Sequence, residues 1–342
     1  LQFYGPKAMS IFGGPIPMAH ASDQESAHFG LRGGLMTHDQ ITNYPMFMEV
    51  ELAALVDIGY TIDLRNFFGT SLYADNAAGI DIVINSGFFA SQGLDSGLNW
   101  LGYDENRANT SPFGIGLHIY GSNYNASIEK NLLADGAGGA GVRMDGFSNT
   151  VTIAPGTAVT GNGSRGTGLL VAFGSGHNVV SRGDIIAAGP LGIGARFDFG
   201  APYVNEQLHS YGTYHLNQEG GGSHSGNIGG PLVESFDLSG LLAGGASSAE
   251  GQYLSGEFVN YGGRPIALYI GPGAHVKDIN VLNGARIHGD IISRWNPAAF
   301  SLPGPLSNYM TDLTFGRKTN STGKAIPASS DEDFRLHYRG NI

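Results

Sequence analysis

The sequence predicts an all-β protein: a right-handed parallel β-helix, or solenoid, with a short N-terminal α-helical segment. Glycine accounts for 55 of the 342 residues and charged residues for only 14%, whereas about a quarter of an ordinary domain is charged. From about Arg65 onward, short β-branched runs alternate with Gly, Asn, Ser and Asp turns, which is typical of closely spaced strands. A Gly-x-Gly pair also returns every 25 to 27 residues, and a period of this size indicates stacked supersecondary units.

The composition excludes several classes of protein. The glycines follow no Gly-X-Y triplet, and 41% hydrophobic residues are enough to build a buried core. A formal charge of −11 with only 18 Lys and Arg provides no basic surface for phosphates, so we expect no nucleic acid partner. No apolar run approaches the roughly eighteen residues that a membrane helix needs. The absence of cysteine excludes disulfides and thiolate metal sites.

The segment from Tyr44 to Tyr60 is the one stretch with a convincing helical pattern. Pro45 suits a first helical turn, and Gly59 is placed to end the helix in a left-handed cap. Apolar residues between them fall at helical spacing and form one stripe that must pack on another element; they are Met48, Leu52, Leu55 and Val56. Upstream, residues 3–17 are rich in Gly and Pro and are predicted to be loops.

The first 64 residues contain three features in a fixed order: His28, the pair Leu35-Met36 eight residues further on, and the helix sequence from Ala53 to Tyr60. In these features the segment resembles the C-terminal lobe of leishmanolysin-like metzincin zinc peptidases. The resemblance implies that His28 is the third zinc ligand and that Met36 is the methionine of the turn beneath the metal. His20 and His38 flank the same region but lack the spacing.

The chain departs from this family because no H-E-x-x-H occurs anywhere in it. A catalytic zinc needs three protein ligands and an open water position, with the Glu of that motif acting as base. Zinc is therefore expected only if an upstream segment supplies the motif; the alternative is a degenerate peptidase lobe. The chain alone is not predicted to be an enzyme. In the alternative interpretation, His28 is a surface histidine and Met36 is core filler.

The repeat beginning with Gly-x-Gly predicts three short strands per turn of chain. The glycine pairs lie at Gly114/Gly116, Gly139/Gly141, Gly166/Gly168 and Gly192/Gly194. Each is followed by a strand, an Asn-containing turn, a second strand and a third apolar stretch, with no room for a helix. The turn residues Asn125, Asn149 and Asn178 are candidates for an inward ladder between repeats, or are ordinary turn residues.

Residues from Glu257 to Trp295 show the same alternation of short apolar runs and turns, in a run that begins around Leu268-Tyr269-Ile270 and ends at Gly289-Asp290-Ile291. This run resembles the late β-helix repeats of bacterial autotransporter passengers. The resemblance implies a secreted or outer-membrane-associated product. It divides the chain into residues 1–64, a stalk at 65–296, and an irregular linker at 297–342 leading toward a translocation barrel. Residues 201–248 lose the period and are predicted to be an insertion or irregular repeats.

Three functions remain open from the sequence. The first is an autotransporter passenger fragment whose partners are an upstream peptidase segment or a downstream barrel of the same precursor. The second is a structural or adhesive surface β-helix that contacts host or cell-surface molecules. The third is a glycan-active β-helix enzyme with paired carboxylates. Its candidate residues are Asp145, Asp184, Asp198 and Glu206, of which no pair stands out, so solvated surface positions are expected.

Overall fold

In the computed structural model the chain is mostly β, with parallel sheets, and its described residues contain two short helices. The residues described are 1–18, 28–37, 43–199, 203–204, 207–208, 213–218, 222–227, 231–254, 257–296, 309–320, 325–327, 329 and 334–342. Three residues considered in the sequence analysis, His20, His38 and Glu206, are not among the residues described.

Three sheets contain most of the strands, and the chain visits them in a fixed order. The first sheet has seven parallel strands, β3 (Phe68–Leu72), β7 (Ile115–Ile119), β10 (Ala140–Met144), β13 (Thr167–Val171), β16 (Ile193–Phe197), β25 (Ile266–Ile270) and β28 (Asp290–Ser293). The second has eight, β4 (Asp81–Ile84), β8 (Asn125–Ile128), β11 (Thr150–Ile153), β14 (Ser175–Ser181), β21 (Leu232–Leu238), β26 (His275–Leu282), β29 (Asp312–Thr319) and the antiparallel β30 (Ala325–Pro327). The third has six, β9 (Leu132–Leu133), β12 (Ala158–Thr160), β15 (Asp184–Ala187), β22 (Leu241–Gly244), β27 (Arg286–His288) and β31 (His337–Arg339).

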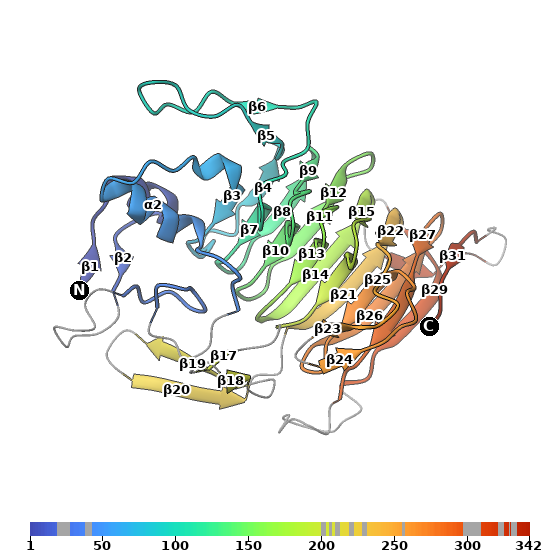
Figure 1. Ribbon diagram of the computed structural model, residues 1–342. Coiled ribbons are helices and arrows are strands. Elements are labelled where there is room, and N and C mark those ends of the chain that lie inside the picture. The colour runs from blue at the N-terminus through green and yellow to red at the C-terminus, as the bar shows by residue number, and fades with distance from the viewer. Residues whose placement is uncertain are drawn as a thin grey trace.

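Successive repeats lie side by side, so that the two termini are at opposite ends of the molecule (Figure 1). The four Gly-x-Gly pairs each open a strand of the seven-stranded sheet, and β7, β10, β13 and β16 are neighbours there, as the period predicts. The register holds each residue against its counterpart, for example Val142 against Leu117 and Leu169. These three side chains belong to the core enclosed by the sheets and are fully buried.

The second glycine of each pair is required by close approach between sheets. A Cβ at Gly141 would lie 2.4 Å from Val159 Cγ1 and 2.8 Å from the Gly168 carbonyl oxygen. Only glycine lets the seven-stranded and six-stranded sheets come this near.

The remaining elements are short. The helices are α1 (Pro6–Phe12) and α2 (Glu49–Asp57), followed by a 3-10 turn at Leu64–Asn66. Five antiparallel pairs complete the structure: β1 (Gln2–Phe3) with β2 (Ile16–Pro17), β5 (Ala90–Ser91) with β6 (Tyr103–Asp104), β17 (Tyr203–Val204) with β18 (Gln207–Leu208), β19 (Thr213–Gln218) with β20 (Gly222–Asn227), and β23 (Gln252–Leu254) with β24 (Glu257–Val259). No helix among the described residues is long and apolar enough to span a bilayer.

The helical predictions need two corrections. Helix α2 begins at Glu49 rather than near Pro45, because the Glu51 carboxylate accepts from the Met48 N–H at 2.7 Å and caps the helix there. The prediction of loop for residues 3–17 is wrong at α1. Its first turn is capped from a distance by Asp57, whose carboxylate oxygens accept from the N–H groups of Lys7 and Ala8, each at 2.9 Å.

The two segments in which the sequence shows no regular period both contain strands of the main sheets. Within residues 201–248, β21 and β22 pair in parallel with β14 and β15 and so continue the repeat. Within residues 297–342, predicted as linker, β29 and β31 extend the sheets beyond β26 and β27. The segments on the two sides of the predicted boundary at residue 64 share one core, because Ala8 and Leu52 belong to the same buried cluster as Ile115 and Ala140.

The predicted ladder of Asn125, Asn149 and Asn178 is wrong, although Asn149 does bond to backbone groups of the interior. Asn149 is fully buried. Its side-chain amide donates to the carbonyl oxygens of Gly121 at 2.9 Å and Asp145 at 2.7 Å, and its Oδ1 accepts from the Tyr124 N–H at 2.9 Å. Asn125 and Asn178 occupy a different column, since both pair with Thr150.

Candidate functional site

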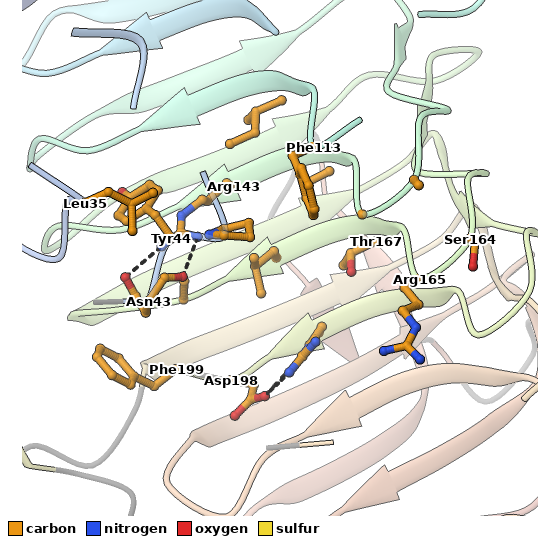
Figure 2. Close-up of a pocket in the computed structure, with 18 residues that line it drawn as sticks. Leu35, Asn43, Tyr44, Phe113, Arg143, Ser164, Arg165, Thr167, Asp198 and Phe199 are labelled. Carbon is orange, nitrogen blue, oxygen red and sulfur yellow. Dashed lines mark hydrogen bonds and ion pairs between the residues drawn. The ribbon is translucent and has the colours of Figure 1, made fainter. Parts of the chain in front are cut away.

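A cavity of about 630 Å³ lies on the outer face of the seven-stranded sheet, beside the N-terminal segment (Figure 2). Its floor includes Ala140, Leu170 and Ala172. One wall comes from residues 35 and 43–45, and the other from the turns that precede the Gly-x-Gly strands. A volume of this size suits a small ligand or a few side chains.

A buried polar cluster closes one end of the cavity. It is formed by Tyr44 of the N-terminal segment, His118 on β7, Arg143 on β10 and Asp145 just after β10. The Tyr44 hydroxyl lies 2.9 Å from His118 Nε2 and donates to Asp145 Oδ2 at 2.9 Å. The guanidinium of Arg143 lies 3.5 Å from the centroid of the Tyr44 ring. It donates to both Asp145 oxygens, at 2.9 and 3.2 Å, and to Asn43 Oδ1 at 3.0 Å.

Burial, the charge of Arg143 and hydrogen bonding together determine the charge states in this cluster. Burial raises the pKa of Tyr44, so the phenol stays protonated and its single proton goes to Asp145. Burial is the largest influence on the pKa of Asp145 and raises it, but the charge of Arg143 and the hydrogen bonds from His118 and Arg143 together outweigh burial and hold that pKa well below its usual range. Burial lowers the pKa of His118. The imidazole is therefore neutral, and its Nε2–H donates to the phenol oxygen.

The cluster anchors the N-terminal segment to the sheet rather than presenting reactive groups. All four of its side chains are at most 5% exposed. Arg32 reinforces the anchor, since its guanidinium lies 4.7 Å from the Tyr120 ring centroid and 4.5 Å from that of Phe173. A buried polar network stabilises the fold only while every member keeps its hydrogen-bond partner, because an unpaired buried group is costly. We therefore expect the N-terminal segment to stay docked on the sheet.

A second Arg–Asp pair faces the same cavity two strands further along. Arg196 on β16 donates to Asp198 Oδ2 from Nε at 3.1 Å and from Nη2 at 2.6 Å. Leu170 on β13 stands between the two arginines in register. The sequence carried a signal that we missed: Asp145 and Asp198 each follow the second glycine of their repeat by four residues, with an arginine two residues earlier.

Of the other carboxylate candidates, Asp184 is described, and it does not join this site. Asp184 lies on β15 of the six-stranded sheet, where Arg286 Nη2 approaches its Oδ1 at 3.2 Å. The expectation that Asp145 is a solvated surface residue is wrong, because its side chain is buried and paired. A carboxylate with so low a pKa does not serve as a proton donor.

The predicted zinc residues lie in a different part of the N-terminal segment. His28 is half-buried, and the Met36 side chain packs at the edge of the N-terminal core. The Met36 N–H donates to Glu51 Oε1 at 2.7 Å, which ties this turn to the start of α2. Burial raises the pKa of Glu51. Among the described residues, no three His, Asp or Glu side chains are grouped as metal ligands, and His28 alone does not supply the three protein ligands of a catalytic zinc.

A second groove, of about 480 Å³, crosses the outer face of the eight-stranded sheet. Two columns of side chains run in register across β11 to β26. One is polar throughout, and the other is polar except at Val180. Asn280 donates to Asp237 Oδ1 at 2.7 Å, and Ser235 donates to Asn178 Oδ1 at 2.9 Å. Burial raises the pKa of Asp237.

Comparison with known proteins gives no further assignment. No protein-family model, no curated protein and no solved structure matches this chain.

Proposed function

We propose that this chain is part of the passenger of an autotransporter, in which a right-handed parallel β-helix forms the stalk. The observation that carries the proposal is the in-register parallel pairing of strands far apart in sequence, repeat after repeat, in three sheets. Each repeat then contacts only its neighbours, which is the construction of an extended scaffold. A cysteine-free chain suits a passenger that crosses the outer membrane unfolded and folds at the cell surface.

In this proposal, residues 1–64 are the C-terminal part of a metallopeptidase-like lobe that is fixed to the stalk. The fixing contact is the Tyr44 cluster, which joins the N-terminal segment to β7 and β10 through buried hydrogen bonds. The stalk holds the lobe, and catalysis depends on an upstream segment that brings the missing ligands. His28 is the residue of this chain that would face such a segment.

Export tests the proposal as a whole. The chain is fused ahead of an outer-membrane translocation barrel, and intact cells are treated with protease. We expect a surface-exposed, protease-resistant core. The matched control is Gly141→Val, which cannot fit beside Val159 and should reach the surface in a protease-sensitive form. Retention of the wild-type chain inside the cell would contradict the proposal.

Elemental analysis tests the zinc part separately. Zinc is measured in the native protein, together with intact mass to detect an associated upstream segment. We expect stoichiometric zinc only where that segment is present, and its loss in His28→Ala but not in the control His337→Ala, which alters an exposed histidine. If the His28→Ala variant retains zinc, His28 is not a zinc ligand.

Adhesion is a second candidate, favoured by the polar groove of the eight-stranded sheet. Its columns of hydroxyl and amide groups match the hydroxyls of a glycan in hydrogen-bonding character. Thr152→Trp would fill this groove. Loss of binding to immobilised neutral polysaccharide in that variant supports adhesion there, and undiminished binding argues against it.

A further inference from the structure

Two arginines line the groove of about 480 Å³ on the eight-stranded sheet. Arg182 lies one residue beyond β14, and its Nε is buried without a hydrogen-bond partner. Within the described part of the chain, neither Arg182 nor Arg317 on β29 forms a side-chain hydrogen bond or an ion pair. A guanidinium is always charged and carries five N–H donors, and leaving such donors unpaired is costly where they are buried. The fold therefore leaves a need for an anionic acceptor at these two positions.

Register places both arginines on one long edge of the groove. Strands β14, β21, β26 and β29 are consecutive neighbours in the sheet (Figure 1). Arg182 directly follows β14, and Arg317 pairs with Leu282 in the corresponding row. Three strand spacings of about 4.8 Å therefore separate them, which puts their Cα atoms about 14 Å apart. Asp278 stands on the opposite edge, four residues before Leu282 and so about 13 Å away along β26.

The middle and the opposite edge of the groove offer acceptors. The half-buried carboxylate of Asp278 takes part in no hydrogen bond or ion pair among the residues that the structure describes. Asp237, between the two edges, accepts from Asn280 at 2.7 Å. The charge of Arg317 offsets part of the rise in the pKa of Asp237 without forming an ion pair with it. The groove therefore combines a cationic edge with carboxylates that can accept from hydroxyl groups.

We propose that this groove, if it is the adhesive surface of the second candidate function, binds a glycan in which a uronic acid alternates with a neutral sugar. Each uronate carboxylate meets one guanidinium, whose fork matches a carboxylate in two parallel hydrogen bonds. Sugar hydroxyls donate to Asp278 and share the amide and hydroxyl side chains of the groove. The charges of the two Arg and two Asp residues in the lining cancel, so these carboxylates repel a densely sulfated chain more than a sparsely charged one.

Two hexasaccharides that differ only in charge test this assignment. One alternates glucuronate with N-acetylglucosamine, and the other is its carboxyl-reduced form, in which each glucuronate has become glucose. Each is titrated into the full chain by calorimetry at low and at high salt. We expect the acidic form to bind about tenfold more tightly at low salt, as one hydrogen bond to a charged group implies. This preference should shrink at high salt, because salt screens the attraction between exposed charges.

Arginine variants locate the binding. Arg182→Gln and Arg317→Gln should each reduce the preference for the acidic hexasaccharide about threefold, and the double variant should abolish it. The matched control is Arg107→Gln, which removes an exposed arginine that follows β6 and should leave the preference unchanged. Thermal unfolding of each variant shows whether it is folded.

The outcomes separate this inference from adhesion itself. Equal binding of the two hexasaccharides would overturn the recognition of charge and leave adhesion at the groove standing, whereas binding of neither would refute both. A preference that survives in the double variant, or tighter binding of a sulfated oligosaccharide without uronate, would also overturn the proposal. The comparison of the two hexasaccharides on the wild-type chain remains decisive should a variant fail to fold.

Discussion

Tyr44→Phe removes one hydroxyl from the anchor of the N-terminal segment. That hydroxyl accepts from His118 and donates to the Asp145 carboxylate, with both oxygen–partner distances at 2.9 Å. A hydrogen bond to a charged group contributes about 1.5–3 kcal/mol, and a buried donor left unsatisfied costs about 1–3 kcal/mol. The phenyl ring of the variant retains the stacking contact with Arg143, whose other hydrogen bonds also remain.

Relaxation reduces the expected effect. His118 Nε2 already lies 3.7 Å from Asp145 Oδ2, so a small movement of the ring restores part of the lost bonding. We therefore expect Tyr44→Phe to lower the free energy of unfolding by about 2 kcal/mol. The matched control is Tyr4→Phe, in which the lost hydroxyl bonds only to the exposed Gln2 side chain. Its effect should be below about 0.5 kcal/mol.

Urea unfolding at pH 7.5, followed by tryptophan fluorescence, provides the measurement. The chain has two tryptophans. Trp100 packs on Tyr103, whose hydroxyl donates to a carbonyl oxygen of β3, and Trp295 follows β28, so they report on opposite ends of the seven-stranded sheet. An unfolding free energy for Tyr44→Phe within about 0.5 kcal/mol of the wild-type value would refute the reasoning, because the anchor would then contribute nothing measurable.

Further predictions concern the interior and the pH dependence. Asn149→Ala should lower the free energy of unfolding by about 2–4 kcal/mol in the same assay, because three buried backbone groups lose their hydrogen bonds. The control Asn125→Ala, at an exposed position, should cost far less. Equal losses in the two variants would count against the buried network. Burial lowers the pKa of His118, so its contribution to stability is complete above the unfolded pKa of about 6.5 and is lost as the pH falls toward the folded value. The free energy of unfolding should then decline below about pH 6.5, by at most about 1.4 kcal/mol per pH unit from this group. The variant His118→Gln should flatten this decline. If the pH profile of the variant equals that of the wild type, His118 is not held neutral by burial. Gly141→Ala should cost about 1–3 kcal/mol because its Cβ would collide with Val159, while Gly14→Ala, with open space around its Cβ, should be nearly neutral; comparable effects on thermal unfolding would disprove the close approach of the two sheets.

The sequence predicted the parts of the fold that repeat. The Gly-x-Gly period correctly predicted that β7, β10, β13 and β16 are equivalent, because the second glycine meets the same steric demand in every repeat. Helix α1 could not be predicted locally, since its cap comes from Asp57 at the end of α2. For residues 201–248 the sequence left an insertion and irregular repeats both open, because residues 201–230 interrupt the period.

The site was predictable only in part. Arg143 and Asp145 recur as Arg196 and Asp198 at the same distance from the glycines, and a column-by-column alignment of the repeats would have found them. Tyr44 could not be found in this way, because it lies about one hundred residues away from Arg143 and Asp145 in sequence and meets them only after the N-terminal segment packs on the sheet. Whether His28 binds zinc stays a prediction.

The most direct test of the central claim, the stacked parallel β-helix, is a distance series between spin labels on the eight-stranded sheet. The chain has no native cysteine, so labels can be placed at will. Asp81, Asn125 and Asp312 occupy one outward column, and six strand spacings separate Asp81 from Asp312. At about 4.8 Å per spacing, the pair 81/312 should lie about 29 Å apart and the pair 125/312 about 24 Å apart. If the 125/312 distance is not shorter than the 81/312 distance by about one strand spacing, roughly 4.8 Å, the stacked parallel arrangement is contradicted.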